Sequence, residues 1–321
     1  MKHRRFGRTG WQVSEIGYGM WGMGGWTGSD DNESRRSIDR AVELGCNFFD
    51  TAYAYGMGKS ETLLGEALKR FAGQKLYTAT KVPPKNLKWP GRADTPIADV
   101  FPYEHIIEMT EKSLANLGTT SVDLQQLHVW NDAWVADDGW QRAAQELKRQ
   151  KLVGAFGISV NRWEPANVIK ALRTGLVDSV QVVYNVFDQN PEDQLFPVCR
   201  ELDIAVIARV PFDEGSLTGT LSKDSRWPEG DWRNIYFTPD NLAETLGRVD
   251  RLKTVVPSGM DLPELALRFI LSEPTVSTVI PGMRKEKHVE RNIAASDGAP
   301  LASAVKTALR QHRWDRTHVI P

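Results

Sequence analysis

The chain has 321 residues, 41% of them hydrophobic and 25% charged, the composition of an ordinary globular protein with enough apolar material for a large core. Lys and Arg number 40 against 41 Asp and Glu, and the formal net charge of −1 excludes a basic field that would attract nucleic acid or an anionic membrane. Because the sequence lacks an apolar leader, a run of about 18 apolar residues and any cysteine beyond Cys46 and Cys199, we expect a cytoplasmic protein without a membrane span, disulfide framework or metal site.

Strand and helix patterns alternate along the chain after a predicted β-hairpin at residues 3–15, which turns at Arg8-Thr9-Gly10. Short apolar runs predict strands at residues 16–18, 47–50, 76–81, 122–127, 153–159, 180–183, 204–208 and 276–280. Helical spacing predicts helices at residues 34–44, 60–70, 104–117, 140–149, 164–172, 193–202, 240–254, 262–272 and 286–295. Eight such strands with no linker between halves predict a single α/β domain over residues 1–321, a (β/α)8 TIM barrel with an N-terminal β-hairpin and long loops at its C-terminal face.

Ionisable residues stand at the C-terminal ends of three successive predicted strands: Asp50, Lys81 and His128. Neighbouring parallel strands lie roughly 5 Å apart, so in a barrel these side chains come within reach of one another. Tyr55 follows the first of these strands and can fold back over the same mouth, whereas Tyr53, the rival proton donor, is better placed for packing. A tyrosine beside an ammonium group can act as a general acid, because the cation stabilises the tyrosinate and lowers the tyrosine pKa.

Each of these residues has a simpler explanation when taken alone. His128 by itself would be a buried structural histidine, and Asp50 with Lys81 would be a structural ion pair. Their occurrence together with Tyr55 favours a proton donor for an oxygen that gains charge. The spacing Gly17-x-Gly19-x-x-Gly22 is typical of a dinucleotide-binding turn, but more glycines follow where that turn needs a helix, so we interpret it as a loop.

The same residues belong to a longer series of motifs. Asp50-Thr51-Ala52-x-x-Tyr55-Gly56, Thr80-Lys81 and Leu127-His128 resemble the catalytic tetrad of the aldo-keto reductases. The resemblance continues through Gly157-Ile158-Ser159, Gln181-x-x-Tyr184-Asn185 and Gly215-Ser216-Leu217-Thr218-Gly219, and it ends with Ile280-Pro281-Gly282-Met283-Arg284 and Asn292. These motifs stand in the family's order and cover nearly the whole chain.

This resemblance implies a barrel that binds an extended nicotinamide cofactor, NADPH (NADP+) with NADH as the alternative, and no metal. It implies that Tyr55 is the general acid, Lys81 the cation that lowers its pKa, Asp50 the partner of Lys81, and His128 the residue that orients the carbonyl. Ser159 and Gln181 would hold the cofactor's carboxamide, residues 215–219 would cover the pyrophosphate, and residues 282–292 would hold the adenosine end. The implied cofactor-binding residues are Met20, Trp21, Asp50, Ser159, Asn161, Gln181, Arg209, Pro211, Gly215, Ser216, Leu217, Gly219, Ile280, Gly282, Arg284, His288 and Asn292.

Three positions depart from the family's pattern near the cofactor: Asn161, His288 and Arg209. Many relatives have Ser-Asn directly after the fifth strand, whereas the order here is Ser159-Val160-Asn161, so the role of Asn161 carries over less directly. His288 stands where relatives often carry Gln or Arg near the adenosine phosphate, which leaves the choice between NADPH and NADH open.

Further residues at the predicted mouth have two interpretations each. Arg209 stands where relatives often stack an aromatic ring on the nicotinamide; its planar guanidinium could stack in the same way, or it could form an ion pair with Asp213 or Glu214. Trp21 and Trp130 fall at strand ends or in loops of the catalytic side, so we expect them to line an apolar substrate pocket and not to pack in the core.

The sequence therefore predicts an NADP(H)-dependent oxidoreductase that reduces the carbonyl group of a small aldehyde or ketone to an alcohol. The alternative from another class is a non-catalytic nucleotide-binding subunit that regulates a partner, as channel-associated members of the family do. A lyase or isomerase on the same barrel would need a metal or phosphate site, and the sequence contains no motif for either.

Overall fold

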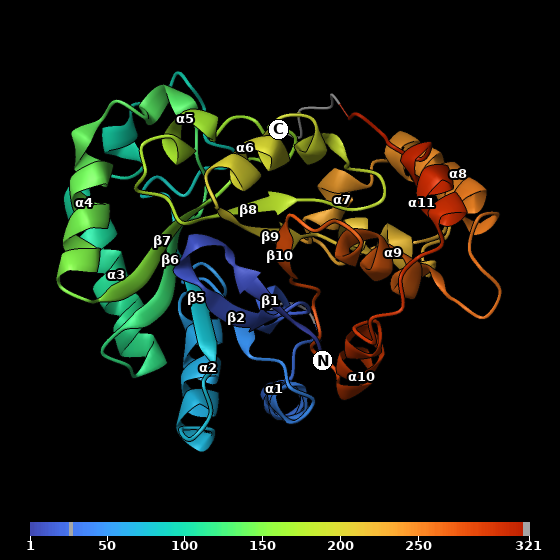
Figure 1. The fold of residues 1–321 in the computed structure, drawn as a ribbon, viewed down its shortest axis with the longest axis horizontal. Coiled ribbons are helices and arrows are strands. Elements are labelled where there is room, and N and C mark those ends of the chain that lie inside the picture. The colour runs from blue at the N-terminus through green and yellow to red at the C-terminus, as the bar shows by residue number, and fades with distance from the viewer. Residues whose placement is uncertain (26–27, 317–321) are drawn as a thin grey trace.

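The computed structural model describes residues 1–25 and 28–316 of the chain. Within them, eight parallel strands form one sheet in the order β10-β9-β8-β7-β6-β5-β4-β3, and hydrogen bonds from Gly17 N to Val279 O (2.8 Å) and from Gly19 N to Pro281 O (3.0 Å) join its two edges. The strands are β3 (Tyr18–Gly19), β4 (Phe48–Asp50), β5 (Tyr77–Val82), β6 (Val122–Leu127), β7 (Val153–Ser159), β8 (Ser179–Val183), β9 (Ala205–Arg209) and β10 (Val276–Val279). The expected (β/α)8 barrel is confirmed (Figure 1).

An antiparallel hairpin of β1 (His3–Phe6) and β2 (Trp11–Ser14) packs on the N-terminal end of the barrel and lies in front of the strands in Figure 1. Gly10 turns the chain with a φ of 74°, a left-handed conformation that glycine adopts without strain. The ring of Phe6 is fully buried, and its centroid lies 5.4 Å from that of Phe48 and 5.6 Å from that of Trp11. This apolar contact closes the barrel at the end away from the predicted chemistry.

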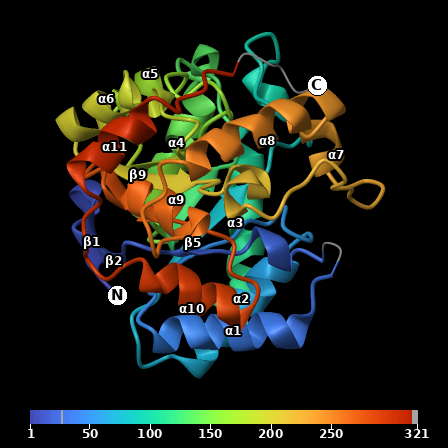
Figure 2. The ribbon, with the colours of Figure 1, turned by 90° about the vertical axis from the view of Figure 1, so that its right-hand side faces the viewer.

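Helices cover the outside of the barrel, and α1 and α10 lie side by side along its lower edge in Figure 2. Side-chain caps begin several of them: Asp30 accepts from Glu33 N at α1, and Asp261 accepts from Glu264 N at α9. The helices of the described residues are α1 (Asp31–Glu43), α2 (Lys59–Arg70), α3 (Tyr103–Leu117), α4 (Asp138–Arg149), α5 (Ile169–Leu172), α6 (Leu195–Glu201), α7 (Arg233–Tyr236), α8 (Pro239–Lys253), α9 (Leu262–Leu271), α10 (Glu286–Ala294) and α11 (Ser303–Arg310).

The segment after β7 differs from the predicted helix at residues 164–172, of which only α5 is helical. Pro165 has no N–H to donate, and the Glu164 carboxylate accepts a hydrogen bond of 2.8 Å from each of the side chains of Asn161 and Asn167. These side-chain bonds compete with helical backbone bonds and hold the chain in turns. Two helices, α7 and α11, were not predicted at all.

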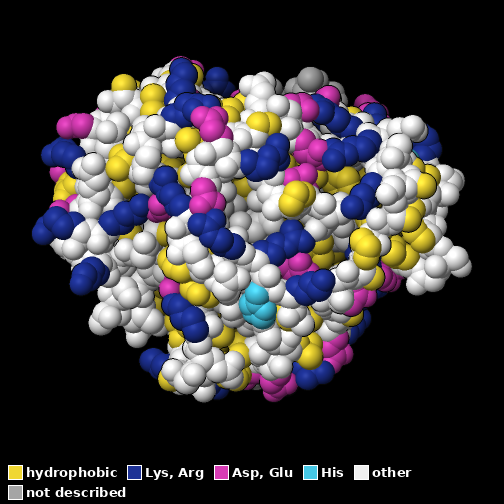
Figure 3. All heavy atoms as spheres, in the orientation of Figure 1, with side chains coloured by type: hydrophobic (Ala, Val, Ile, Leu, Met, Phe, Trp, Pro, Cys, Tyr) yellow, Lys and Arg dark blue, Asp and Glu magenta, His cyan; other side chains and the backbone are white. Residues whose placement is uncertain are grey.

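The long predicted loops lie at the C-terminal ends of the strands, at residues 83–102 after β5 and residues 210–232 after β9. On the face shown in Figure 3, Lys and Arg side chains are interspersed with Asp and Glu, as the near-zero net charge leads one to expect. Among the described residues, no helix is both long enough and apolar enough to span a bilayer.

Candidate active site

The ends of β4 and β5 bring a carboxylate, an ammonium group and a phenol together. Lys81 Nζ lies 2.6 Å from Asp50 Oδ1 and 3.4 Å from the Tyr55 hydroxyl, and it also donates to the Thr51 carbonyl oxygen at 2.7 Å. Neither the Lys81 side chain nor that of Asp50 is more than 2% exposed. A buried ammonium group requires such a partner, so this ion pair fixes the cation below the phenol.

Two glutamines hold the other oxygen of the Asp50 carboxylate. Gln181 Nε2 from β8 donates to Asp50 Oδ2 at 2.7 Å, and Gln126 Nε2 from β6 donates to it at 3.3 Å. The expected role of Gln181 at the cofactor's carboxamide stays a prediction, and in the structure its amide nitrogen donates to this carboxylate. Gln126 was not predicted; the signal was its place two residues before His128 on one strand, since alternate residues of a strand face the same side.

Burial outweighs the ammonium group in setting the acidity of Tyr55. Removal of the phenol from water raises the Tyr55 pKa, and Asp50 adds to the rise, while the charge of Lys81 acts in the opposite direction and lowers it. The net shift of the Tyr55 pKa is upward, whereas the sequence led us to expect a lowering by Lys81. Burial acts to lower the pKa of Lys81, but the charges of Asp50 and Tyr55 raise it by more than burial lowers it. The net shift of the Lys81 pKa is upward, so the side chain keeps its positive charge.

His128 follows β6 and faces Tyr55 edge to ring, with 5.6 Å between the ring centroids and 74° between the planes. Burial, assisted by the charges of Lys81 and Arg209, holds the His128 pKa well below its usual value, so the imidazole is neutral. Its Nδ1 atom is buried and has no hydrogen-bond partner among the described residues. A buried polar atom without a partner at a barrel mouth is a place for a polar group of a ligand.

Trp89, in the loop after β5, forms a further wall of the site, although only Trp21 and Trp130 were expected to line the pocket. Its indole meets the His128 ring edge to face at 5.7 Å and is 44% exposed. Asn161 fixes this loop: its Oδ1 accepts from Gly91 N (3.0 Å) and its Nδ2 donates to Gly91 O (2.9 Å). Asn161, expected at the cofactor, thus bonds the loop that carries Trp89.

The two tryptophans that were expected to line the substrate pocket differ in their exposure to solvent. Trp21 begins a short 3-10 helix (Trp21–Met23) after β3 and is 45% exposed, on the catalytic side of the barrel. Trp130 is fully buried, with its ring 5.0 Å from that of Trp140 in α4 and its Nε1 bonded to Asp132 Oδ1 at 2.9 Å. We correct the assignment of Trp130, because a core indole between strand and helix cannot line an open pocket.

The remaining predicted cofactor residues near the mouth are buried. Met20 is fully buried directly after β3, and its backbone N–H donates to Asp50 O at 2.9 Å. Ser159 ends β7 and is 3% exposed. Pro211 is buried behind Val210, whose φ of 58° turns the chain away from β9.

Arg209 ends β9, with its guanidinium at the mouth. Its Nη2 donates to Val160 O at 2.9 Å, and its buried Nε has no partner among the described residues. The expected alternative of an ion pair with Asp213 or Glu214 is not found among the described contacts, since these acids pair with Arg316 and Arg162 respectively. Burial, followed by the charge of Arg162, lowers the pKa of Arg209 to about 10.

The segment predicted to cover a pyrophosphate forms the short 3-10 helix η6 (Asp213–Thr218), which includes Gly215, Ser216 and Leu217 and ends at Gly219. Asp213, Glu214 and Gly215 have φ values of 45°, 55° and 106°. These three successive residues form a tight turn, in which Asp213 N donates to Val210 O at 3.1 Å and Gly215 N donates to Phe212 O at 2.9 Å.

The predicted adenosine-end residues follow β10. Ile280 is 7% exposed and Gly282 lies at the surface. The side chain of Arg284 runs along the loop after β3: a Cβ built on Gly22 would lie 3.8 Å from its Cδ, and one on Gly28 would lie 3.9 Å from its Nη2. On α10, His288 is exposed and Asn292 is 4% exposed.

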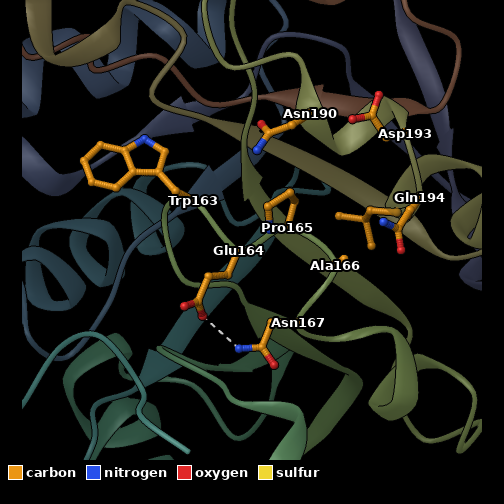
Figure 4. A pocket seen from close by; sticks show the side chains of 9 residues that line it. Trp163, Glu164, Pro165, Ala166, Asn167, Asn190, Asp193 and Gln194 are labelled. Carbon is orange, nitrogen blue, oxygen red and sulfur yellow. Dashed lines mark hydrogen bonds between the residues drawn. The ribbon is translucent and has the colours of Figure 1, made fainter. Parts of the chain in front are cut away.

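A surface cavity of about 360 Å³ lies apart from this cluster, between the loop after β7 and the start of α6. Figure 4 shows Glu164 and Asn167 directed toward each other at its edge, with Asn190 and Asp193 on the other side. The hydrogen bond drawn there, from Asn167 Nδ2 to Glu164 Oε2 at 2.8 Å, joins two residues of the loop that follows Asn161. Among the described residues, no group of three or more His, Cys, Asp or Glu is placed to hold a metal ion.

The residues present fit a nicotinamide cofactor. The partnerless atoms His128 Nδ1 and Arg209 Nε lie at the mouth, where a carbonyl or carboxamide oxygen could accept from a guanidinium N–H. Residues 215–219 follow β9 at the same end of the barrel, and the side chain of Arg284 follows β10, where its guanidinium suits a phosphate.

Comparisons with known proteins agree with this geometry. A sequence profile described as the Aldo/keto reductase family matches residues 15–313. The chain is 27% identical over 329 residues to the NADH-specific methylglyoxal reductase of Escherichia coli (strain K12), covering 97% of this chain and 98% of that protein. It is 28% identical over 325 residues to a probable voltage-gated potassium channel subunit beta of Oryza sativa subsp. japonica, covering 94% and 93%.

Among solved structures, the holo form of aldo-keto reductase AKR11C1 from Bacillus halodurans superposes with a TM-score of 0.78 at 28% identity, covering 99% of this chain and 98% of that one. The family profile spans nearly the whole chain, from before β3 to beyond α11. The chain belongs to the aldo/keto reductase family.

Proposed function

We propose that the chain is an NADP(H)-dependent oxidoreductase that reduces the carbonyl group of a small aldehyde or ketone to an alcohol. The observation that supports it most is the buried series of Asp50, Lys81 and Tyr55, with contacts of 2.6 Å and 3.4 Å, beside a neutral His128. A cation placed to stabilise a tyrosinate has a direct use in proton transfer and little structural value.

In this proposal Tyr55 donates its hydroxyl proton to the carbonyl oxygen as that oxygen gains negative charge. Lys81 stabilises the tyrosinate that remains, and Asp50, held by Gln181 and Gln126, keeps the ammonium group in place. A substrate carbonyl oxygen that accepts a hydrogen bond from Tyr55 would also lie beside the His128 imidazole, because the Tyr55 and His128 ring centroids are 5.6 Å apart. His128, neutral near pH 7, orients that oxygen by a hydrogen bond without competing for the proton.

The bound cofactor supplies the hydride. Within this proposal Met20, Trp21, Ser159, Arg209 and Pro211 surround the nicotinamide, and the residues of 215–219 cover the pyrophosphate. Arg284 holds the 2′-phosphate of NADPH, because a guanidinium suits a phosphate dianion. The E. coli relative named for NADH specificity makes this preference a point to measure.

The alternative is a nucleotide-binding regulatory subunit, and the similarity to a channel subunit beta supports it. The buried catalytic residues favour the enzyme. Both proteins would bind the cofactor, but the enzyme alone would turn it over.

The test is consumption of NADPH and NADH with a panel of small aldehydes, ketones and open-chain sugars, together with identification of the alcohol product. We expect carbonyl-dependent NADPH oxidation with an equimolar yield of alcohol. Tight cofactor binding without turnover of any panel member, in protein of confirmed fold, would favour the regulatory alternative.

A further inference from the structure

The turn before the proposed pyrophosphate-covering segment has a backbone conformation that its residue types do not favour. Asp213 and Glu214 have φ values of 45° and 55°, and Val210, three residues earlier, has 58°. Non-glycine residues in this region cost free energy and persist only where the surrounding structure holds them. Something outside the turn must therefore hold it.

Asp213 is held by the C-terminal segment of the described chain. Arg316 Nη2 lies 2.8 Å from Asp213 Oδ1, and the side chains of the pair are 2% and 0% exposed. The same carboxylate accepts from the Tyr236 hydroxyl at 2.5 Å and from Ser216 Oγ at 2.7 Å. Ser216 belongs to the covering segment, so the Asp213 carboxylate connects that segment directly to Arg316.

Arg316 is itself fixed from several directions. Its guanidinium carbon lies 4.2 Å from the ring centroid of Trp314, whose backbone N–H donates to Phe187 O at 2.8 Å. Its Nη2 also lies 3.5 Å from Asp188, a buried carboxylate in the loop after β8. The segment 311–316 is thus anchored to the barrel independently of the turn that it holds.

The neighbouring residue Glu214 has its own arginine. Its carboxylate pairs with Arg162 of the loop after β7 and accepts from Trp232 Nε1 at 3.2 Å. The two adjacent strained residues are therefore held by arginines from two different segments. Arg162 lies in the loop that follows Ser159, so the covering segment is tied to another proposed part of the cofactor site.

We infer that Arg316 is a positioning residue of the cofactor site: by its ion pair with Asp213 it holds the turn that carries the pyrophosphate-covering segment, so that the C-terminal segment sets how long the cofactor stays bound. The inference rests on the proposed function. The contacts of Arg316 within the described residues go to Asp213, Asp188, the Tyr236 hydroxyl and aromatic rings, none of them in the catalytic cluster. Its loss should therefore change cofactor release and leave the affinity for the carbonyl substrate unchanged.

The experiment compares wild type with Arg316→Met, Arg316→Lys and the control Arg313→Met. Arg313 lies on the same segment but forms exposed pairs with Asp193 (2.6 Å) and Asp315 (2.7 Å), so the control removes the same charge from the same segment. NADPH affinity is measured by fluorescence titration, NADPH dissociation by stopped-flow displacement, and exposure of residues 213–219 by hydrogen exchange.

Arg316→Met should weaken NADPH binding about ten-fold or more through faster dissociation, since it leaves a buried carboxylate unpaired. Residues 213–219 should exchange faster, while the KM for the carbonyl substrate stays the same. Arg316→Lys, which keeps the charge but not the forked geometry, should restore part of the affinity. Arg313→Met should stay within about two-fold of wild type.

Unchanged NADPH affinity and dissociation in folded Arg316→Met, or an equal loss in Arg313→Met, would overturn the inference and leave the proposed function intact. If Arg316→Met does not fold, Asp213→Asn decides, because it removes the charge of the pair with little change in shape and keeps one acceptor oxygen for either Ser216 or Tyr236. It should show the same faster release, and unchanged release there would overturn the inference. Wild type that binds neither NADPH nor NADH would overturn the proposed function and the inference with it.

Discussion

Tyr55 retains its proton although the Lys81 ammonium group lies 3.4 Å from its hydroxyl, because burial raises the Tyr55 pKa by more than Lys81 lowers it. For an acid that must donate at neutral pH, this direction is useful, since the phenol stays protonated throughout the physiological range. The charge of Lys81 then acts on the product of the transfer, the tyrosinate, and less on the resting state. Bound cofactor and substrate would bury the phenol further.

This balance predicts the pH dependence of carbonyl reduction. The Tyr55 pKa lies above its usual value of about 10, and the His128 pKa lies well below its usual value of about 6.5, so neither group titrates between about pH 7 and 9. We expect kcat/KM for reduction to be flat across that range. Alcohol oxidation, which needs tyrosinate, should rise with pH over the same range. A limb near pH 6.5 that disappears in His128→Gln would contradict the neutral assignment of His128.

Arg284 should decide the cofactor preference if its guanidinium contacts the 2′-phosphate. We expect Arg284→Ala to weaken NADPH binding by about 1.5–3 kcal/mol, the usual contribution of a hydrogen bond to a charged group, and to leave NADH nearly unaffected. The measurement is a pair of dissociation constants for each protein, with Lys287→Ala on the exposed side of α10 as the control. Equal losses for the two cofactors would exclude phosphate recognition by Arg284 and make His288 the next candidate.

At the scale of elements, the loop at 83–102 is held by side chains from several other segments, among them Asn131, Trp134 and Asn161. Asn161 bonds both backbone groups of Gly91, and the loop then presents Trp89 to His128. Gly91 itself has no room for a side chain, because a Cβ there would lie 2.8 Å from the Trp134 ring and 3.1 Å from Trp130 O. The substrate pocket therefore depends on the loop after β7 as well as on its own loop.

Substitution of Asn161 distinguishes its observed role, the hydrogen bonds to Gly91, from its implied role in cofactor binding. If it holds Gly91, Asn161→Ala should raise the KM for the carbonyl substrate about three- to ten-fold, the loss expected for one or two neutral hydrogen bonds, and leave NADPH affinity unchanged. Trp89→Ala should have the same effect on KM. A loss of NADPH affinity that exceeds the change in KM would instead support the implied role of Asn161 in cofactor binding.

The regular elements could be predicted because their signals are local. Hydrophobic periodicity marks α3 and α4, and acidic caps mark the starts of α1 and α9. The turns at 164–168 could not be predicted, because they depend on side-chain hydrogen bonds from Asn161 and Asn167 to Glu164 that compete with the backbone hydrogen bonds of a helix. Trp130 was misassigned for a related reason: sequence places a residue at a strand end but not on the inner or outer side of the barrel.

At the scale of the whole molecule, closure of the barrel brings the site together. Asp50, Lys81 and His128 stand on three neighbouring strands, so sequence order alone predicts their proximity. Gln181 reaches Asp50 from β8 across the barrel, a contact of residues 131 positions apart. Arg316 and Asp213 are likewise far apart in the sequence. Neither contact can be predicted from a local sequence pattern.

The hairpin at the opposite end should contribute to stability alone. Phe6→Ala removes a fully buried ring that packs on Phe48 and Trp11, and we expect it to lower the free energy of unfolding by about 3–5 kcal/mol. The kcat/KM of the folded fraction should stay near the wild-type value, since the site lies at the other end of the strands. Urea titration measures the loss of stability, and steady-state kinetics measures kcat/KM. A fall in kcat/KM as large as that caused by a substitution in the active site would show that the hairpin end and the catalytic end of the barrel are coupled.

The measurement that tests the account most directly is the single-turnover rate of NADPH oxidation by an aldehyde for wild type and Tyr55→Phe. The substitution removes only the hydroxyl, so NADPH affinity and the unfolding transition should stay at wild-type values and serve as controls. The account predicts a loss in rate of about 10²-fold or more, the scale of a positioned general acid. A Tyr55→Phe rate within a few-fold of wild type, with cofactor binding intact, would contradict the assignment of Tyr55 as the proton donor.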